Sequence, residues 1–231
     1  MSAAAVALAT VAGFALLQLL AHHQAQAAAE ADQAQQLGPA PGSAWDSLDL
    51  WGFTTAAIES RQVGAAVGGL TSEAANVRAF LAMIEVAEGT GRGGRDPYRT
   101  CYGYRHTIQN LSEHPAVSGE WRGESLASLG PQYAGKVSTA AGRYQIIRPT
   151  WVGVKRALDL PDFSPDSQDR AAVYLIKQRG ALGAVQAGQF ARAVELCRQE
   201  WASLPGAGYG QPERQLAELQ AAYTQAGGTL A

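Results

Sequence analysis

The chain has 231 residues, of which 47% are hydrophobic and 16% charged, and its formal net charge at pH 7 is −2. This length and composition are typical of a soluble globular protein with one main domain, and they exclude a largely disordered chain. The small net charge argues against a protein that binds nucleic acid by neutralising phosphates. The two cysteines, Cys101 and Cys197, lack CxxC or Cys/His spacing, which argues against a zinc site or a disulfide-built scaffold.

The first predicted element is an apolar segment, residues 3–21, within an N-terminal region that we place at 1–27. Its run of about nineteen uncharged residues has the length of a helix that crosses a bilayer. Alanine, glycine, threonine and glutamine dilute its hydrophobicity, and no Lys or Arg precedes it. Three interpretations stay open: a signal anchor that remains in the membrane, a signal peptide with "AQA" at 25–27 as its cleavage site, and an Ala-rich helix packed in a larger assembly.

Residues 28–71 form the next region, an Ala/Gln tract that gives way to a Pro/Gly/Ser stretch. This composition is typical of a linker with little core of its own. From residue 72 onward the helix start and stop signals recur, so we place a folded domain at 72–231.

Within this domain, helical patterns alternate with caps and stops at the expected positions. We predict helices from Thr71 or Ser72 to Glu88, with Gly89 as the stop, and from Ser164 to Arg179, followed by Gly180. Three further helices are predicted at Thr150–Leu158, Gln189–Ser203 and Glu213–Ala226. Only the stretch Cys101–Ser138, rich in Gly, Thr and Tyr, indicates short strands and loops. The predicted fold class is therefore α+β, predominantly helical with a small β lobe.

One ionisable residue lies on the apolar face of the first of these helices. At about 100° per residue, Val77, Phe80, Leu81 and Ile84 share a stripe that Glu88 continues, whereas Glu85 is predicted to flank the stripe and meet solvent. Burial and the helix C-terminus both raise the pKa of a carboxyl, and a carboxyl protonated near neutral pH can act as a general acid. The alternative is a glutamate at a frayed helix end whose side chain turns back to water.

Two later stretches have the composition of a groove for a neutral sugar polymer. In "STAAGRYQI", residues 138–146, small residues allow close approach of a ligand, while Tyr144 and Gln145 supply a stacking face and an amide. In "WASLPGAGYGQ", residues 201–211, three glycines surround Tyr209. Either stretch alone is also typical of a tight turn beside an aromatic residue.

The ordered motifs "AFLAMIEVAEGT", "LSEHP", "STAAGRYQI", "DFSPDSQD", "IKQRGAL" and "WASLPGAGYGQ" closely resemble the phage lambda lysozyme (endolysin) family over about residues 78–229. The resemblance implies a lysozyme-like fold and a lytic transglycosylase that cleaves the β-1,4 bond between N-acetylmuramic acid and N-acetylglucosamine in peptidoglycan. It implies neither metal nor cofactor. Peptidoglycan glycan strands are the implied partner, and nucleic acid is not.

The family's functional residues fall on named positions of this chain. The resemblance implies that Glu88 is the single catalytic glutamate and that the "AAGRYQ" element places Tyr144 and Gln145 against the glycan. Ser138 and Gly142 are expected to shape the turn of this substrate-binding element, and Tyr209 is the third candidate wall of the groove.

The sequence departs from the family pattern in two places. At residues 91–110 little more than "GY" resembles the family. Asp96 lies in this stretch and could be a second acid that activates water, so a hydrolytic muramidase is the alternative. The extra region before residue 72 implies a membrane or virion partner. It predicts either a signal-anchored or exported enzyme at the host inner membrane and periplasm, acting in lysis, or a virion lysozyme that acts during DNA entry.

Overall fold

The computed structural model describes residues 66–208 and 212–231. The predicted N-terminal helix, the linker as far as residue 65 and Tyr209 lie outside the described residues. Among the described helices, none combines the length and the apolar character that a membrane span requires.

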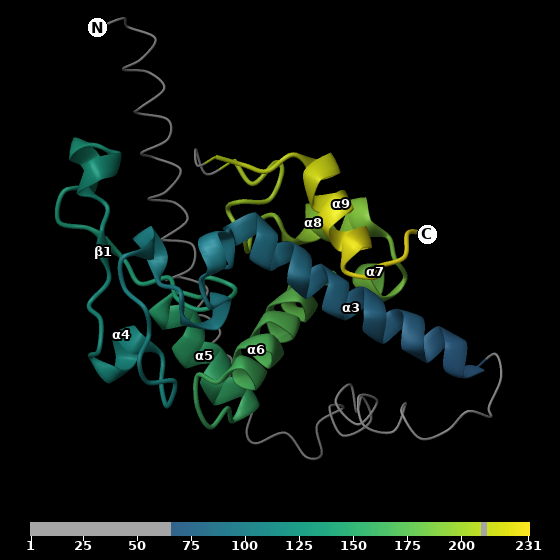
Figure 1. The fold of residues 1–231 in the computed structure, drawn as a ribbon, viewed down its shortest axis with the longest axis horizontal. Coiled ribbons are helices and arrows are strands. Elements are labelled where there is room, and N and C mark those ends of the chain that lie inside the picture. The colour runs from purple at the N-terminus through teal and green to yellow at the C-terminus, as the bar shows by residue number, and fades with distance from the viewer. Residues whose placement is uncertain (1–65, 209–211) are drawn as a thin grey trace, which may run out of the picture.

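The first helix of the described chain is α3 (Ala66–Glu88), which crosses the molecule from end to end (Figure 1). It begins earlier than the Thr71 or Ser72 start that we predicted, because a Thr or Ser that resembles an N-cap is also tolerated within a helix. The predicted stripe of Val77, Phe80, Leu81 and Ile84 is buried. The helix ends at Glu88 as predicted, and Gly89 follows with a φ of 69°, a conformation that favours glycine.

Helix α6 (Pro165–Gln178) packs against α3, and α5 (Arg148–Leu158) packs against α6. In α6 the Ser164 hydroxyl accepts a hydrogen bond from the Ser167 backbone N–H at 3.4 Å, with Pro165 at the first helical position. The predicted cap and start of α6 are therefore confirmed.

Three helices lie on the other side of α3 (Figure 1). They are α7 (Leu182–Gln186), α8 (Phe190–Cys197) and α9 (Leu216–Gln225). The short α7 was not predicted, and α8 ends before the predicted Ser203 because the Cys197 carbonyl accepts a turn bond from Glu200 N–H at 2.8 Å. The chain after α8 is therefore irregular, and this segment contains Trp201 and Ser203.

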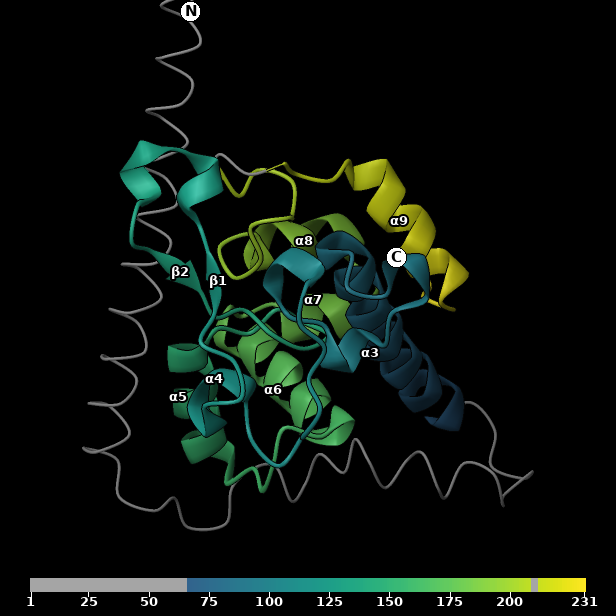
Figure 2. The same ribbon diagram turned by 60° about the vertical axis from the view of Figure 1, so that its left-hand side comes forward.

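The predicted small β lobe is confirmed and stands to one side of the helices, away from α9 (Figure 2). Its strands β1 (Glu124–Ser125) and β2 (Val137–Ser138) pair antiparallel, with Glu124 opposite Ser138 and Ser125 opposite Val137. Helix α4 (Pro115–Ser118) lies nearby. The rest of the lobe is loop and single 3₁₀ turns, which are η1 (Arg92–Gly94), η2 (Pro97–Arg99), η3 (Tyr102–Tyr104), η4 (Ala127–Leu129) and η5 (Pro131–Tyr133).

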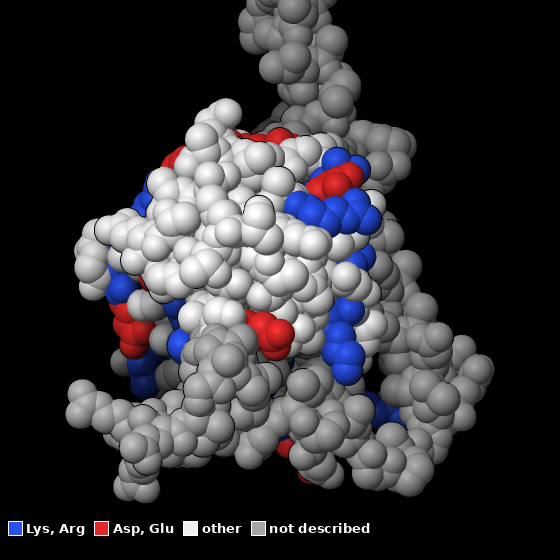
Figure 3. All heavy atoms as spheres, turned by 90° about the vertical axis from the view of Figure 1, so that its right-hand side faces the viewer, with Lys and Arg blue, Asp and Glu red and all other residues white. Residues whose placement is uncertain are grey.

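A single main core joins the helices to the base of this lobe. Its largest fully buried side chains include Trp151, Tyr144, Tyr223, Phe80 and Phe163. The face over α7, α9 and the start of α3 carries few charged side chains (Figure 3). The C-terminal end of α3 lies away from this face (Figure 1).

Candidate active site

Glu88 is the last residue of α3 and stands at the edge of the core. Its side chain is half-buried, while Ala87 before it and Gly89 after it are buried. The Gly89 N–H donates to the Glu85 carbonyl at 2.8 Å, so the last turn of α3 ends at the residue that carries the carboxyl. The partial negative charge of the helix C-terminus disfavours an ionised carboxyl at this position.

The Glu88 carboxyl has the protonation behaviour of a general acid. Burial raises its pKa from 4.5 to about 7, although the Ser203 hydrogen bond and the positive charge of Arg214 act in the opposite direction. The Ser203 hydroxyl donates to Glu88 Oε1 at 2.7 Å. A carboxyl in this environment can hold its proton near neutral pH and release it during a reaction.

The segment after α8 supplies both partners of Glu88. Arg214 N–H donates to the Ser203 carbonyl at 2.8 Å, and Arg214 Nε donates to the Ala87 carbonyl at 3.2 Å. Arg214 also pairs with Glu218 of α9 at 3.6 Å. The end of α3 is therefore tied to a segment that lies more than a hundred residues away in sequence.

Replacing Ser203 with Ala is expected to shift the pH dependence of catalysis. The hydroxyl donates to Glu88 and lowers the pKa of the carboxyl, so its removal raises that pKa and keeps the acid protonated to higher pH. The alkaline limb of the kcat/KM profile should move to higher pH in Ser203→Ala. Ser128→Ala, at an exposed serine, is the matched control, and an alkaline limb that stays in place or moves to lower pH would contradict the assignment.

Buried threonines tie the end of α3 to the predicted groove element. Thr90 Oγ1 donates to the Arg143 carbonyl at 3.0 Å, and Thr100 Oγ1 donates to the Thr90 carbonyl at 3.0 Å. Trp201 Nε1 donates to the Tyr144 carbonyl at 3.1 Å. Residues 138–146 are thus held against both the end of α3 and the segment after α8.

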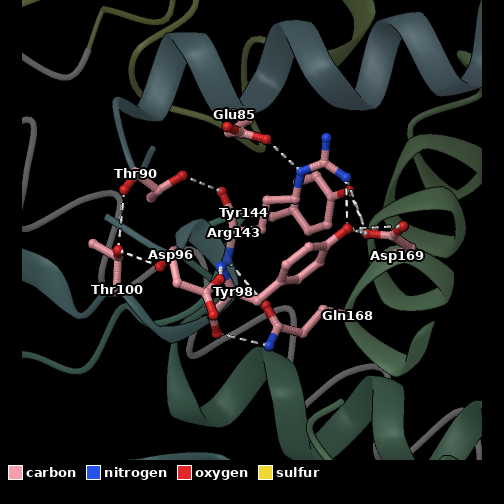
Figure 4. Close-up of polar contacts among 9 residues, drawn as sticks. All are labelled: Glu85, Thr90, Asp96, Tyr98, Thr100, Arg143, Tyr144, Gln168 and Asp169. Atoms are coloured by element: carbon pink, nitrogen blue, oxygen red, sulfur yellow. Dashed lines mark hydrogen bonds and ion pairs between the residues drawn. The ribbon is translucent and has the colours of Figure 1, made fainter. Parts of the chain in front are cut away.

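Arg143 is the centre of a polar network between α3 and α6 (Figure 4). Its Nε donates to Glu85 at 2.7 Å, and its Nη1 donates to the Tyr98 hydroxyl at 2.7 Å and lies 3.4 Å from Asp169. The Tyr98 hydroxyl donates to Asp169 at 3.0 Å. Our prediction that Glu85 is a solvent-facing residue was wrong, because its side chain is only 25% exposed and pairs with Arg143.

Tyr144 belongs to this network rather than to an open surface. Its side chain is 1% exposed, and its hydroxyl donates to Asp169 at 2.6 Å. Burial and the Asp169 charge raise the Tyr144 pKa well above its ordinary value, which keeps the hydroxyl protonated as a donor. Because the ring is buried in the core and its hydroxyl is bound to Asp169, we do not retain Tyr144 as a direct glycan contact.

The other predicted residues of this element lie close together. Gln145 is half-buried with a φ of 50°, and its Nε2 donates to the carbonyls of Thr100 at 3.1 Å and Gly142 at 3.0 Å. Gly142 has a φ of 76°, and a side chain there would collide with Gln168 and Phe163. Ser138 is buried and accepts a hydrogen bond from the Ala140 N–H at 3.3 Å. Gly142 and Ser138 therefore shape the turn, and Gln145 is held in a fixed orientation.

Asp96, the candidate second acid, has other partners. It is exposed, accepts a hydrogen bond from the Tyr98 N–H at 3.0 Å and lies 3.5 Å from the Arg99 guanidinium. These contacts make Asp96 the N-cap of the turn at Pro97–Arg99. In this position its carboxylate stabilises a turn.

The cysteines and the other potential metal ligands of the described residues are not grouped into a metal site. Cys101 and Cys197 are both free and buried. Among residues 66–208 and 212–231, no group of three or more His, Cys, Asp or Glu side chains is arranged to hold a metal. His114 is buried as the N-cap of α4, and burial lowers its pKa to about 4, so it is a neutral structural residue.

Three residues beside Glu88 were not predicted from the sequence. Ser203 donates a hydrogen bond to the Glu88 carboxyl, and the positive charge of Arg214 lowers the pKa of that carboxyl. Tyr104 donates its hydroxyl to the Glu88 backbone carbonyl at 3.0 Å. Ser203 lies within the "WASLPGAGYGQ" stretch, but a single serine near a glycine-rich turn carries no local signal of its partner. Tyr104 lies within residues 91–110, where little of the sequence resembles the family motifs.

Comparisons with known proteins show to which family the chain is related. The family model for endolysins matches residues 78–230. The endolysin of Escherichia phage P2 is 42% identical over 160 residues, which cover 68% of this chain and 95% of that protein. The endolysin of Escherichia phage lambda is 40% identical over 158 residues, which cover 66% of this chain and 92% of that protein.

Solved structures give the same result. The structure of bacteriophage lambda lysozyme complexed with a chitohexasaccharide aligns with a TM-score of 0.58 at 38% identity. The alignment covers 68% of this chain and 97% of that one. A second structure of bacteriophage lambda lysozyme aligns with a TM-score of 0.57 at 36% identity. By the extent of these matches, the chain belongs to the endolysin family.

Proposed function

We propose that this protein is a peptidoglycan-degrading lytic transglycosylase with Glu88 as its acid and base. The observation that carries the proposal is the Glu88 carboxyl at the end of α3, whose pKa burial raises to about 7. Membership of the endolysin family supports peptidoglycan as the substrate. The related lambda lysozyme was solved with a chitohexasaccharide, which supports a glycan-binding groove in this chain.

The proposed reaction uses one carboxyl in both of its protonation states. Glu88 first donates its proton to the glycosidic oxygen, so that N-acetylglucosamine leaves with a free 4-hydroxyl. The resulting carboxylate accepts the proton of the muramic 6-hydroxyl as that oxygen forms a bond to the anomeric carbon. The products are a 1,6-anhydromuramic end and a regenerated acid, with no water consumed.

A hydrolytic muramidase would need a second acid to activate water. Asp96 is the candidate that the sequence offered, and its engagement with the Tyr98 N–H and Arg99 favours the single-carboxyl mechanism. Substrate-supplied attack needs no such partner. Ser203 then positions Glu88 and limits the rise of its pKa.

Product analysis tests the proposal directly. Purified peptidoglycan is digested with the full chain in water enriched in heavy oxygen, and the soluble fragments are analysed by mass spectrometry. We expect anhydro ends that lack one water and carry no label, because the attacking oxygen comes from the sugar. Labelled reducing ends as the main product would overturn the transglycosylase and favour hydrolysis with a second acid.

We further propose that the N-terminal region delivers this enzyme to the host inner membrane or periplasm for lysis. The support is the sequence of residues 3–21, an uncharged segment of membrane-spanning length. Fractionation of cells that express the full chain should place a precursor in the membrane, and recovery of all the protein from the cytosol would contradict this. Recovery from purified phage particles would support the alternative role in DNA entry.

A further inference from the structure

A basic and aromatic segment adjoins the end of α3, at residues 92–105. It holds four arginines, three tyrosines and one acidic residue, in a chain whose net charge is −2. The face over α7 and α9, in contrast, carries few charges (Figure 3). The part of the chain that directly follows Glu88 therefore carries more basic than acidic residues.

Tyr104 places an exposed ring beside the catalytic glutamate. Its hydroxyl donates to the Glu88 carbonyl at 3.0 Å, and 48% of its surface is exposed. Its φ of 60° lies in the left-handed region, which is uncommon for a bulky residue and persists only where surrounding contacts hold it. The hydrogen bond to Glu88 is one such contact, so the ring is fixed at the edge of the site.

Arg95 lies over this ring and has no acidic partner among the described residues. Its guanidinium carbon is 4.4 Å from the centroid of Tyr104, a cation–π arrangement. No carboxylate in the described part of the chain forms an ion pair with Arg95, and its buried Nε has no hydrogen-bond partner there. A fixed guanidinium without a carboxylate is suited to bind one from a ligand.

Arg92 extends the same surface. It lies against Gly89, and its pairing with Glu218 at 3.9 Å joins two side chains that are each about half exposed, so the pair contributes little to stability. Arg99 differs, because its Nη1 donates to the carbonyls of Ile108 at 2.7 Å and Gln109 at 3.0 Å. Arg92 thus has only a weak surface pair and Arg95 has no carboxylate partner among the described residues, while Arg99 holds the loop together.

The chemistry of peptidoglycan places an anion at this location. The muramic acid whose anomeric carbon is attacked carries an acidic stem peptide on its lactyl group, so that peptide must lie close to Glu88 during cleavage. We propose that Arg92 and Arg95 bind the carboxylates of the stem peptide, with Tyr104 orienting Arg95, and that the enzyme thereby prefers peptide-bearing glycan. This inference rests on the proposed function.

The test compares two forms of one substrate. Peptidoglycan is used either untreated or after a carbodiimide and ammonia have converted its stem-peptide carboxylates to amides. Initial rates at limiting substrate give kcat/KM for the wild type, Arg92→Gln, Arg95→Gln and the double variant. Arg156→Gln, at an exposed arginine of α5, removes the same charge elsewhere and is the matched control.

We expect the double variant to lose about tenfold in kcat/KM on untreated peptidoglycan, the size of one charge-assisted hydrogen bond. On the amidated substrate the wild type and the double variant should be equal within about twofold, because the bound charge is gone. Arg156→Gln should match the wild type on both substrates. Arg92→Gln, at a side chain that is about half exposed, keeps the test independent of any folding defect in Arg95→Gln.

The outcomes separate this inference from the function on which it rests. A wild-type enzyme that cleaves both substrates, with the variants reduced equally on both or on neither, overturns stem-peptide binding and leaves the transglycosylase in place. A wild-type enzyme that cleaves neither substrate overturns the proposed function itself. A loss in the double variant that is confined to the untreated substrate supports the inference.

Discussion

Replacing Glu88 with Gln is expected to lower the rate of peptidoglycan cleavage by about 10²–10⁴-fold, the contribution of a positioned general acid and base. The amide keeps the shape of the side chain and its capacity to accept the Ser203 hydrogen bond, but it has no proton to transfer. Release of soluble fragments from purified peptidoglycan measures the loss. Glu73→Gln, at an exposed position on the same helix, should keep wild-type activity. A Glu88→Gln enzyme within tenfold of the wild type would place the chemistry elsewhere.

The same variant should also reveal the raised pKa through stability. The Glu88 pKa is about 7 in the folded protein against 4.5 ordinarily, so between these values the unfolded chain releases a proton that the folded protein retains. The wild type therefore loses stability as pH rises from 4.5 to about 7, and the loss is complete above that range. Glu88→Gln lacks this dependence and should gain on the wild type as pH rises.

The size of this effect is bounded by the pKa shift. The full shift corresponds to about 3 kcal/mol, and the partial exposure of Glu88 reduces the expected change to about 1–3 kcal/mol. Urea unfolding of both proteins at about pH 4 and about pH 8 gives the difference. A stability difference between the two proteins that does not change with pH would show that the Glu88 pKa is not raised.

Replacing Arg143 with Met is expected to destabilise the domain by about 3 kcal/mol at neutral pH. The side chain is 15% exposed and joins Glu85 of α3 to Asp169 of α6, so its loss leaves two carboxylates without their cation. Burial already raises the Asp169 pKa, and the Arg143 charge opposes that rise. Without Arg143, Asp169 protonates more readily as pH falls, so the destabilisation should be smaller in acid.

Urea unfolding measures this loss against two matched variants. Arg170→Met removes a partly exposed partner that lies 4.0 Å from Asp166, and it should cost less than about 1 kcal/mol. Adding Asp169→Asn to Arg143→Met should recover part of the loss, because one uncompensated carboxylate is removed. If Arg143→Met and Arg170→Met destabilise equally, the network contributes no more than a surface pair.

Features that depend on residues close together along the chain were predictable from the sequence. The period of Val77, Phe80, Leu81 and Ile84 placed Glu88 on the buried stripe, and Gly89 marked the end of α3. Ser164 and Pro165 marked the start of α6. Each of these depends on residues within one or two helical turns, so the local pattern was sufficient.

The small β lobe was predictable as a region but not in detail. Its strands have two residues each, too few for an alternating pattern to define their limits. The same limit explains α7, whose five residues are shorter than the window in which helical periodicity can be recognised. The start of α3 was missed for a different reason, because a Ser or Thr can precede a helix or lie within it.

By itself, the sequence determined the helical frame, the catalytic candidate and, through its ordered motifs, the family. Only the tertiary structure decided which groups meet Glu88 and which residues of the groove element face inward. Ser203 is 115 positions away and Arg143 is 58 positions from Glu85, so no local pattern links them. Tyr144 and Glu85 changed roles for the same reason: a side chain's partner depends on packing between distant segments, whereas periodicity reports only the face of its own helix or turn.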